Sequence, residues 1–169
     1  MPERKTIRKR GCDYNSRGVY FLTICTLNRR CILSRIIGIA SPDGMYLDDT
    51  IVELTDFGKI ADKYIKQIGD FYEDIFIDQY VIMPNHIHIM LRYTGGGPSG
   101  TPVPTDIKNS VVSRFVSTFK RFCNKEYGEN IWQPRFHDHI IRDYDDYVLH
   151  TNYILENPRG WRLDELYTE

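Results

Sequence analysis

The order of predicted elements places this chain in the α+β class, as a ferredoxin-like split βαββαβ antiparallel sheet followed by one additional C-terminal helix. Two further observations support this prediction. A tight turn at Pro84-Asn85 joins two adjacent strand-forming runs, and the Gly/Pro-rich connector at 94–105 is too short to separate domains. We therefore expect residues 1–169 to form a single domain, with a basic N-terminal arm over about residues 1–17.

The first half of the chain supplies one strand, a short hairpin and one helix. Residues 19–26 are rich in β-branched and aromatic side chains, which predicts a buried strand. A turn signal at 41–44 predicts a hairpin before the helix. Apolar residues then recur at helical spacing over 57–68, with Thr55 as the N-cap and Gly69 as the stop.

The second half adds two paired strands, a helix, a further strand and a last helix. Apolar residues four apart mark the buried face of the first of these helices, and Gly128 ends it. Acidic residues within 143–146 suit the first turn of the last helix, because the helix dipole favours negative charge there, and Pro158 ends that helix. The expected bounds are 75–83 and 86–93 for the paired strands, 106–125 for the helix and 135–142 for the further strand.

The strand at 86–93 carries two histidines separated by one isoleucine. Because side chains alternate along a strand, His86 and His88 project from one face, about 7 Å apart, and the isoleucine projects from the other. Two imidazoles in this arrangement can bind one metal ion. The last helix is free to cover this face of the sheet, and it carries Tyr153 and Asn157 one turn apart.

Tyr153 lies away from the apolar stripe of the last helix. On a helical wheel the stripe is formed by Tyr147, Val148, Thr151, Ile154 and Leu155, and Tyr153 falls nearly opposite to it. A tyrosine that only packs usually lies on the apolar face, so Tyr153 is a candidate functional residue. An ordinary exposed surface tyrosine is the alternative interpretation.

Charge and cysteine content restrict the class of protein. The net charge of −1 is unusual for a strongly cationic nucleic-acid binder, but basic segments at 1–17 and 106–142 flank an acidic stretch at 41–78. This pattern is compatible with a locally positive face and equally with ordinary solvated surface charge. No apolar run has transmembrane or signal-peptide character, so we expect a cytoplasmic chain. The cysteines expected to be reduced thiols are Cys12, Cys25, Cys31 and Cys123.

Several motifs in the same order resemble one family. Met83-Pro84-Asn85-His86-Ile87-His88 and Tyr153-Ile154-Leu155-Glu156-Asn157-Pro158 resemble the single-tyrosine transposases of the His-hydrophobe-His (HUH) type, also called IS200-like. The resemblance is closest to the REP-associated branch of these enzymes. Further matching segments extend it over nearly the whole chain, at 13–18, 21–26, 131–133 and 138–142.

The resemblance implies a DNA transposase and single-stranded DNA endonuclease that cleaves and rejoins hairpin-containing DNA through a covalent 5′-phosphotyrosine. It implies Tyr153 as the nucleophile, and His86, His88 and Asn157 as ligands of a divalent metal, Mg²⁺ or Mn²⁺. The expected partner is single-stranded or hairpin DNA, and a homodimer and a monomer are both open. The residues predicted to contact DNA phosphates are Arg114, Lys120, Arg121, Arg135 and Arg142.

Other interpretations compete with this one. A non-catalytic ferredoxin-like module can hold single-stranded nucleic acid on its sheet without cutting it. A metal-dependent phosphodiesterase that uses water would need the histidines but not Tyr153. The segment His137-Asp138-His139 is a second His-x-His on a predicted strand and therefore a competing metal site, although a packed or DNA-contacting histidine is the preferred interpretation there.

Overall fold

The computed structural model describes residues 16–38, 41–43, 50–95 and 110–169. Three sequence-based predictions therefore lie wholly or mostly outside the described residues. These are the basic arm, the Gly/Pro connector, and the start of the helix predicted from residue 106.

A four-stranded antiparallel sheet forms the centre of the molecule, with its strands in the order β4-β5-β1-β6. These are β4 (Ile75–Ile82), β5 (His86–Tyr93), β1 (Gly18–Cys25) and β6 (His137–Ile140). Among these four strands, the first along the chain lies between the third and the fourth, which is the arrangement of the ferredoxin-like split fold. The predicted fold class is confirmed, and β5 with its histidines lies inside the sheet rather than at its edge.

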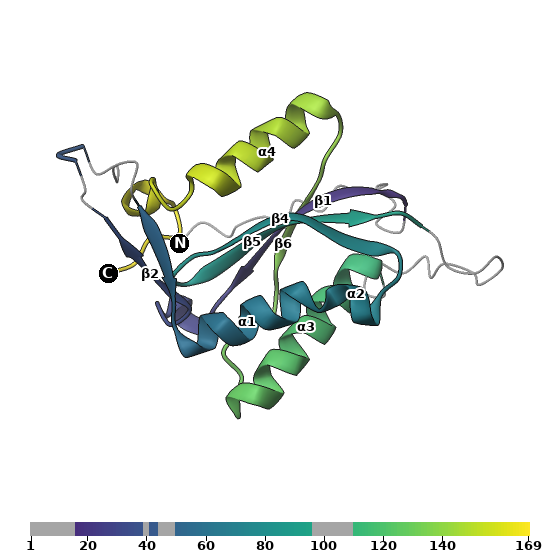
Figure 1. Cartoon of the computed structure of the whole chain (residues 1–169), viewed down its shortest axis with the longest axis horizontal. Helices are drawn as coiled ribbons and strands as arrows, with labels where there is room; N and C mark the ends of the chain where they lie inside the picture. The colour runs from purple at the N-terminus through teal and green to yellow at the C-terminus, as the bar shows by residue number, and fades with distance from the viewer. Residues whose placement is uncertain (1–15, 39–40, 44–49, 96–109) are drawn as a thin grey trace.

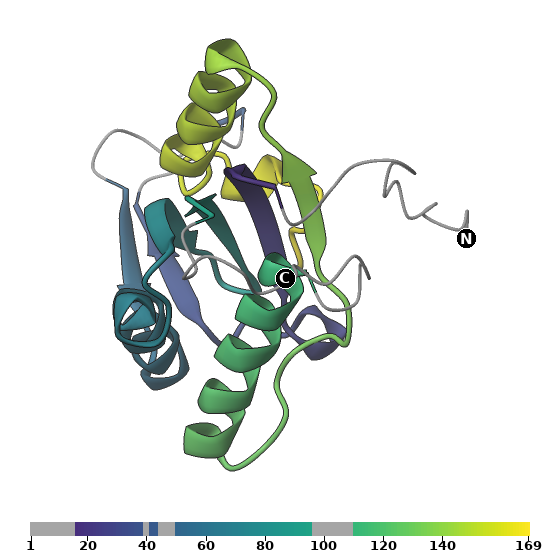
Figure 2. The same ribbon diagram turned by 90° about the vertical axis from the view of Figure 1, so that its right-hand side faces the viewer.

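The helices divide between the two faces of this sheet, as Figure 1 and Figure 2 show. The helices α1 (Asp56–Lys66), α2 (Ile68–Phe71) and α3 (Val111–Tyr127) cover one face, and α4 (Tyr144–Glu156) lies over the other. The main core lies between the sheet and the first group of helices, because the odd-numbered apolar residues of β5 point to that side. Its fully buried members include Leu22, Ile24, Ile87, Ile89, Leu91, Ala61, Ile65, Phe115 and Phe119.

The predicted cap at Thr55 and the predicted stop at Gly128 are confirmed, and Asp143, expected only as part of an acidic helix start, is the N-cap of α4. The Thr55 side chain accepts a hydrogen bond from the Gly58 N–H at 3.2 Å at the start of α1, and the Asp143 side chain accepts one from the Asp146 N–H at 2.9 Å at the start of α4. Gly128 ends α3 with a φ of 78°, in the left-handed region that glycine adopts without strain.

Two predicted boundaries are wrong. Gly69 does not stop the first helix, because α1 already ends at Lys66 and Gly69 lies inside the short helix α2. The chain bends at Gln67, which caps α1, and the separate turn of α2 then places Ile68 back in the core. The strand expected at 135–142 is also shorter, since β6 pairs with β1 only over four residues at the sheet edge.

A second, smaller sheet lies beside the first. It is the hairpin of β2 (Ser34–Ile37) and β3 (Ile51–Leu54), which confirms the hairpin predicted before α1. A short helical turn, η1 (Leu27–Arg29), leads into it, and another, η3 (Trp161–Leu163), follows α4. Trp161 packs with the buried Met83 from the β4–β5 turn, so the C-terminal segment is fastened next to the start of β5.

Two further sequence expectations can be compared with the structure. Cys25, Cys31 and Cys123 form no disulfide bond among the described residues, and Cys12 lies outside them. Within the described part of the chain, no helix combines the length and the apolar character needed to span a membrane.

Candidate active site

The turn between β4 and β5 is built around the buried side chain of Asn85. The turn closes with a hydrogen bond of 2.8 Å from the Met83 N–H to the His86 carbonyl. The Asn85 amide group donates to the Leu166 carbonyl at 2.8 Å and to Thr168 Oγ1 at 3.1 Å. Asn85 therefore ties the end of the chain to the start of the histidine strand, which gives the Pro84-Asn85 motif a structural role.

His86 and His88 lie side by side on the face of β5 that α4 covers, and both are buried. His86 Nδ1 lies 2.8 Å from Asn85 Oδ1, and His88 Nδ1 lies 2.9 Å from Thr23 Oγ1. Because an amide oxygen only accepts hydrogen bonds, the proton of His86 is on Nδ1. The Nε2 atoms of both rings are buried and have no hydrogen-bond partner among the described residues. This is the arrangement of metal-binding histidines, in which one ring nitrogen is oriented by a neighbour and the other is left for the ion.

Both imidazoles are held in the neutral form. Burial lowers the pKa of His86 to about 4, and the nearby Asp164 carboxylate opposes this effect only in part. Burial lowers the pKa of His88 well below its usual range, and the neighbouring His86 ring lowers it further. Neutral imidazole is the form that binds metal ions, so these two side chains are ready to act as ligands at neutral pH.

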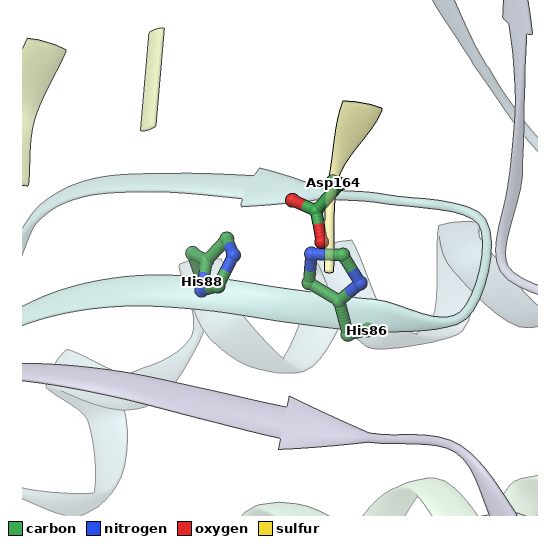
Figure 3. A group of neighbouring side chains, drawn as sticks. All are labelled: His86, His88 and Asp164. Atoms are coloured by element: carbon green, nitrogen blue, oxygen red, sulfur yellow. The ribbon is translucent and has the colours of Figure 1, made fainter. Parts of the chain in front are cut away.

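Asn157 and Asp164 complete this group of side chains. Asn157 follows the last turn of α4 and is 5% exposed, and its Nδ2 donates to Asp164 Oδ2 at 2.7 Å. Its Oδ1 is buried and, within the described residues, has no hydrogen-bond partner. Figure 3 shows the Asp164 carboxylate next to the His86 ring, and one ligand atom from each of His86, His88 and Asp164 lies within 4.8 Å of the others.

Tyr153 lies at the edge of this group, one helical turn before Asn157. Its ring is 44% exposed and meets the rings of His88 and Phe21 edge-on, with centroid distances of 5.1 and 6.0 Å. Its hydroxyl donates to Asp164 Oδ2 at 3.2 Å. Burial raises the pKa of Tyr153 to about 12, and the charge of Asp164 adds to this effect, so the hydroxyl is protonated at neutral pH.

The helical-wheel prediction for α4 is partly wrong. Ile154 is buried as expected, but Leu155 is 55% exposed. The side chains that turn toward the sheet include the polar His150 and Asn157 together with Tyr153. The reason is that α4 covers a polar face of the sheet, so apolar periodicity does not mark its contact side.

A second cluster of ligand-capable side chains lies at the start of α4. It consists of His139 on β6 with Asp146 and His150 on α4, and one ligand atom from each lies within 4.8 Å of the others. His139 Nε2 is 2.9 Å from Asp146 Oδ2, and His150 Nδ1 is 3.0 Å from Asp146 Oδ1. Burial alone would raise the pKa of Asp146, but hydrogen bonds from His139 and from the Arg142 N–H outweigh it and lower that pKa. His137 is exposed and does not belong to this cluster, so the second His-x-His does not act as a pair.

The basic residues predicted to contact DNA are spread over the molecule. Arg114, Lys120 and Arg121 lie on α3, on the face of the sheet opposite to α4, and the exposed Arg142 directly precedes the α4 cap. Lys120 donates to the carbonyls of Gln133 and Arg135, at 2.7 and 3.3 Å, and burial lowers its pKa to about 8. The structure does not bring these side chains together around the histidines.

Sequence reasoning missed Asp164, which belongs to no recognised motif. Its position seven residues after Asn157, in a segment fastened by Trp161, offered no periodic or spacing signal. The two histidines, Tyr153 and Asn157 were named from the sequence, and the fold brings these four side chains together.

Comparison with known proteins gives relatives along the whole chain. No family model matches it. An uncharacterized protein of Haemophilus influenzae is 30% identical over 183 aligned positions, covering 98% of this chain and 94% of that protein. A REP-associated tyrosine transposase of Escherichia coli is 33% identical over 87 positions, which are 50% of this chain and 46% of that protein. A second Haemophilus influenzae protein with the same family designation is 27% identical over 86% of this chain and 73% of its own length.

A solved structure extends the likeness to three dimensions. A REP-associated tyrosine transposase bound to a REP hairpin matches with a TM-score of 0.58 and 26% identity, over 86% of this chain and 69% of that one. The fold, the ordered motifs and the named relatives agree with one another. This chain therefore belongs to the REP-associated tyrosine transposase family of IS200-like proteins.

Proposed function

We propose that this protein is a divalent-metal-dependent DNA transposase that cleaves and rejoins single-stranded, hairpin-containing DNA through a covalent 5′-phosphotyrosine at Tyr153. One observation carries the proposal. Three buried polar atoms without hydrogen-bond partners in the described structure, His86 Nε2, His88 Nε2 and Asn157 Oδ1, belong to side chains grouped beside Tyr153. Buried polar atoms are rarely left unpaired unless a ligand, ion or water completes them.

The donor set fits a divalent cation. Two neutral imidazoles and one amide oxygen leave coordination positions for phosphate oxygens and water. Imidazole ligands are compatible with Mn²⁺, whereas Mg²⁺ prefers oxygen ligands and would rely more on the phosphate and water. When bound, the ion would offset negative charge that develops on the phosphate and would orient the scissile bond. His86, His88 and Asn157 are the residues proposed to hold it, and Asn85 and Thr23 orient the two imidazoles through their Nδ1 atoms.

Tyr153 is the proposed nucleophile. Its oxygen would attack the phosphorus, forming a phosphotyrosine bond and releasing the 3′ oxygen of the neighbouring nucleotide. A pKa of about 12 means that the hydroxyl must give up its proton as this bond forms. The phosphotyrosine keeps the energy of the broken phosphodiester, so a 3′ hydroxyl of a second DNA end can reverse the reaction and rejoin strands.

Hairpin DNA is the proposed substrate, because the solved relative is bound to a REP hairpin. Phosphate contacts from basic side chains imply an affinity that falls steeply as the salt concentration rises. The proposed contacts are still those predicted from the sequence, and Arg142 is the one that directly precedes α4. A homodimer and a monomer are both compatible with this proposal.

The test is incubation of the protein with hairpin-containing single-stranded DNA and Mn²⁺, followed by intact mass spectrometry. We expect a protein–DNA adduct whose peptide map places the DNA on Tyr153. Cleavage without any adduct would instead identify a phosphodiesterase that uses water. Binding with neither cleavage nor adduct would identify a non-catalytic nucleic-acid-binding module.

A further inference from the structure

Asp164 connects two of the groups that the proposed reaction uses. A single oxygen, Oδ2, accepts hydrogen bonds from Asn157 Nδ2 at 2.7 Å and from the Tyr153 hydroxyl at 3.2 Å. The other oxygen, Oδ1, accepts from the Leu166 N–H at 2.7 Å, which fixes the direction of the carboxylate. Both oxygens of Asp164 are therefore already engaged by protein groups.

The segment that carries Asp164 is held firmly against the site. Trp161 is buried on Met83, and its ring lies 5.9 Å from that of His86. The Leu166 carbonyl accepts a hydrogen bond from Asn85, the residue that also orients His86. The same contacts therefore fix the position of Asp164 relative to the His86 imidazole.

The contact with Asp164 determines which end of the Asn157 amide faces the histidines. A carboxylate only accepts hydrogen bonds, so it must meet the NH₂ end of the amide. The amide oxygen then points to the opposite side, where it is buried and without a partner among the described residues, like the Nε2 atoms of His86 and His88. If the amide were reversed, the group facing the ion would be an NH₂, which cannot bind a cation.

We propose that Asp164 is a positioning residue that holds the Asn157 oxygen toward the metal ion. This inference rests on the proposed function, because it assumes an ion at His86, His88 and Asn157. It names a residue outside the family-like motifs and gives it a role that acts through Asn157. Asp164 as a direct ligand is the competing arrangement, since its carboxylate lies within 4.8 Å of the histidine ligand atoms. The engagement of both its oxygens favours the positioning role.

A double-mutant cycle on Mn²⁺ binding separates the two arrangements. Calorimetry on the DNA-free protein would compare wild type with Asp164→Ala, Asn157→Ala and the double variant. We expect Asp164→Ala to weaken Mn²⁺ binding by about 10- to 100-fold, as is common for groups that orient a ligand. The double variant should bind no more weakly than Asn157→Ala alone, because Asp164 has nothing left to orient. Additive losses would overturn the proposal and make Asp164 a ligand.

A reciprocal exchange keeps the inference testable if Asp164→Ala is poorly folded. In Asn157→Asp combined with Asp164→Asn, the new amide can donate to the new carboxylate, whose other oxygen then faces the ion. We expect the exchange to restore Mn²⁺ binding that Asp164→Asn alone loses, and a failure to restore it would count against the positioning role.

A matched control addresses simple loss of negative charge. Glu165→Gln removes an acid from the adjacent position and should change Mn²⁺ affinity by less than about threefold, since exposed charges interact weakly. An equal loss in Glu165→Gln and Asp164→Ala would show a general charge effect and overturn the proposal. If the proposed function is wrong, the binding data differ from both of these results. Wild type then binds no Mn²⁺, or His86→Ala binds Mn²⁺ as tightly as wild type does.

Discussion

Two clusters on the same face of the sheet contain the same residue types, two histidines and an aspartate, but they differ in what their nitrogen atoms contact. In the cluster at the start of α4, the His139 ring is hydrogen-bonded to the Asp146 carboxylate, and His150 Nδ1 lies 2.9 Å from the Asp146 backbone carbonyl and 3.0 Å from its carboxylate. In the other, the Nε2 atoms of His86 and His88 are buried and lack partners within the described residues. The difference shows that composition alone does not define a metal site. Buried ring nitrogen atoms that lie close together without partners favour a metal site over a structural contact.

The two clusters are linked through one aromatic ring. Phe21 stacks on His88 at 5.1 Å, meets His150 at 4.7 Å and contacts the Tyr153 ring edge-on. The cluster of His139, Asp146 and His150 therefore fastens β6 to the first turns of α4, and Phe21 connects this cluster to the ring of Tyr153, the proposed nucleophile. We interpret it as a structural support for the helix that presents Tyr153.

The largest effect is expected from Tyr153→Phe, which removes only the hydroxyl oxygen beside the cluster of His86 and His88. The protein–DNA adduct and strand cleavage in Mn²⁺ should fall below detection, because no other group can form the covalent bond. Intact mass spectrometry measures the adduct. Tyr144→Phe and Tyr147→Phe, on the same helix, are the controls and should form it normally. An adduct that maps to another tyrosine would contradict the assignment.

The second-largest effect tests which of the two histidine clusters binds the metal ion. His86→Ala and His88→Ala each remove a proposed ligand, so calorimetry should detect loss of Mn²⁺ binding by about 100-fold or more. His139→Ala should bind Mn²⁺ as wild type does, because its ring is paired with Asp146. The reverse pattern would move the metal site to the start of α4.

Part of the difference between the two histidine clusters could be predicted from the sequence. Strand alternation at 86–93 placed both histidines on one face, and the sequence motif at 153–158 pointed to Tyr153 and Asn157 as candidate site residues. What escaped prediction depends on contacts between distant segments. Asp164 reaches the site because Trp161 packs on Met83, and His139 meets His150 only after β6 pairs with β1. Neither contact leaves a periodic pattern in the sequence.

The third prediction concerns pH and the free energy of unfolding of metal-free protein. The pKa of His86 is about 4 in the folded protein, against an ordinary 6.5. Between these values the unfolded chain binds a proton that the folded chain does not, so stability is full above pH 6.5 and falls as the pH drops toward 4. The loss is on the order of a few kcal/mol at most. Urea unfolding at pH 7.5 and 5 measures it.

A substitution of the His86 ring itself tests the origin of this pH effect. His86→Gln should reduce the dependence of stability on pH without abolishing it, because it removes one of two buried rings whose pKa is lowered and leaves His88 in place. If His86→Gln leaves the slope unchanged, burial of His86 is not its cause.

The smallest effect is expected from His139→Ala in the support at the start of α4. The variant loses a hydrogen bond between the His139 ring and the Asp146 carboxylate, while the Arg142 N–H still donates to that carboxylate. Because the His139 side chain is 36% exposed, water replaces part of this interaction, and the free energy of unfolding should fall by only about 1 kcal/mol. Urea unfolding at pH 7.5 gives the value.

His150→Ala should lower the free energy of unfolding by more than His139→Ala does, since the His150 ring also packs on Phe21. In the double variant the two losses should be non-additive, because the His139 and His150 rings stack on each other with a centroid distance of 4.6 Å. Additive losses would mean that the two histidines support α4 independently.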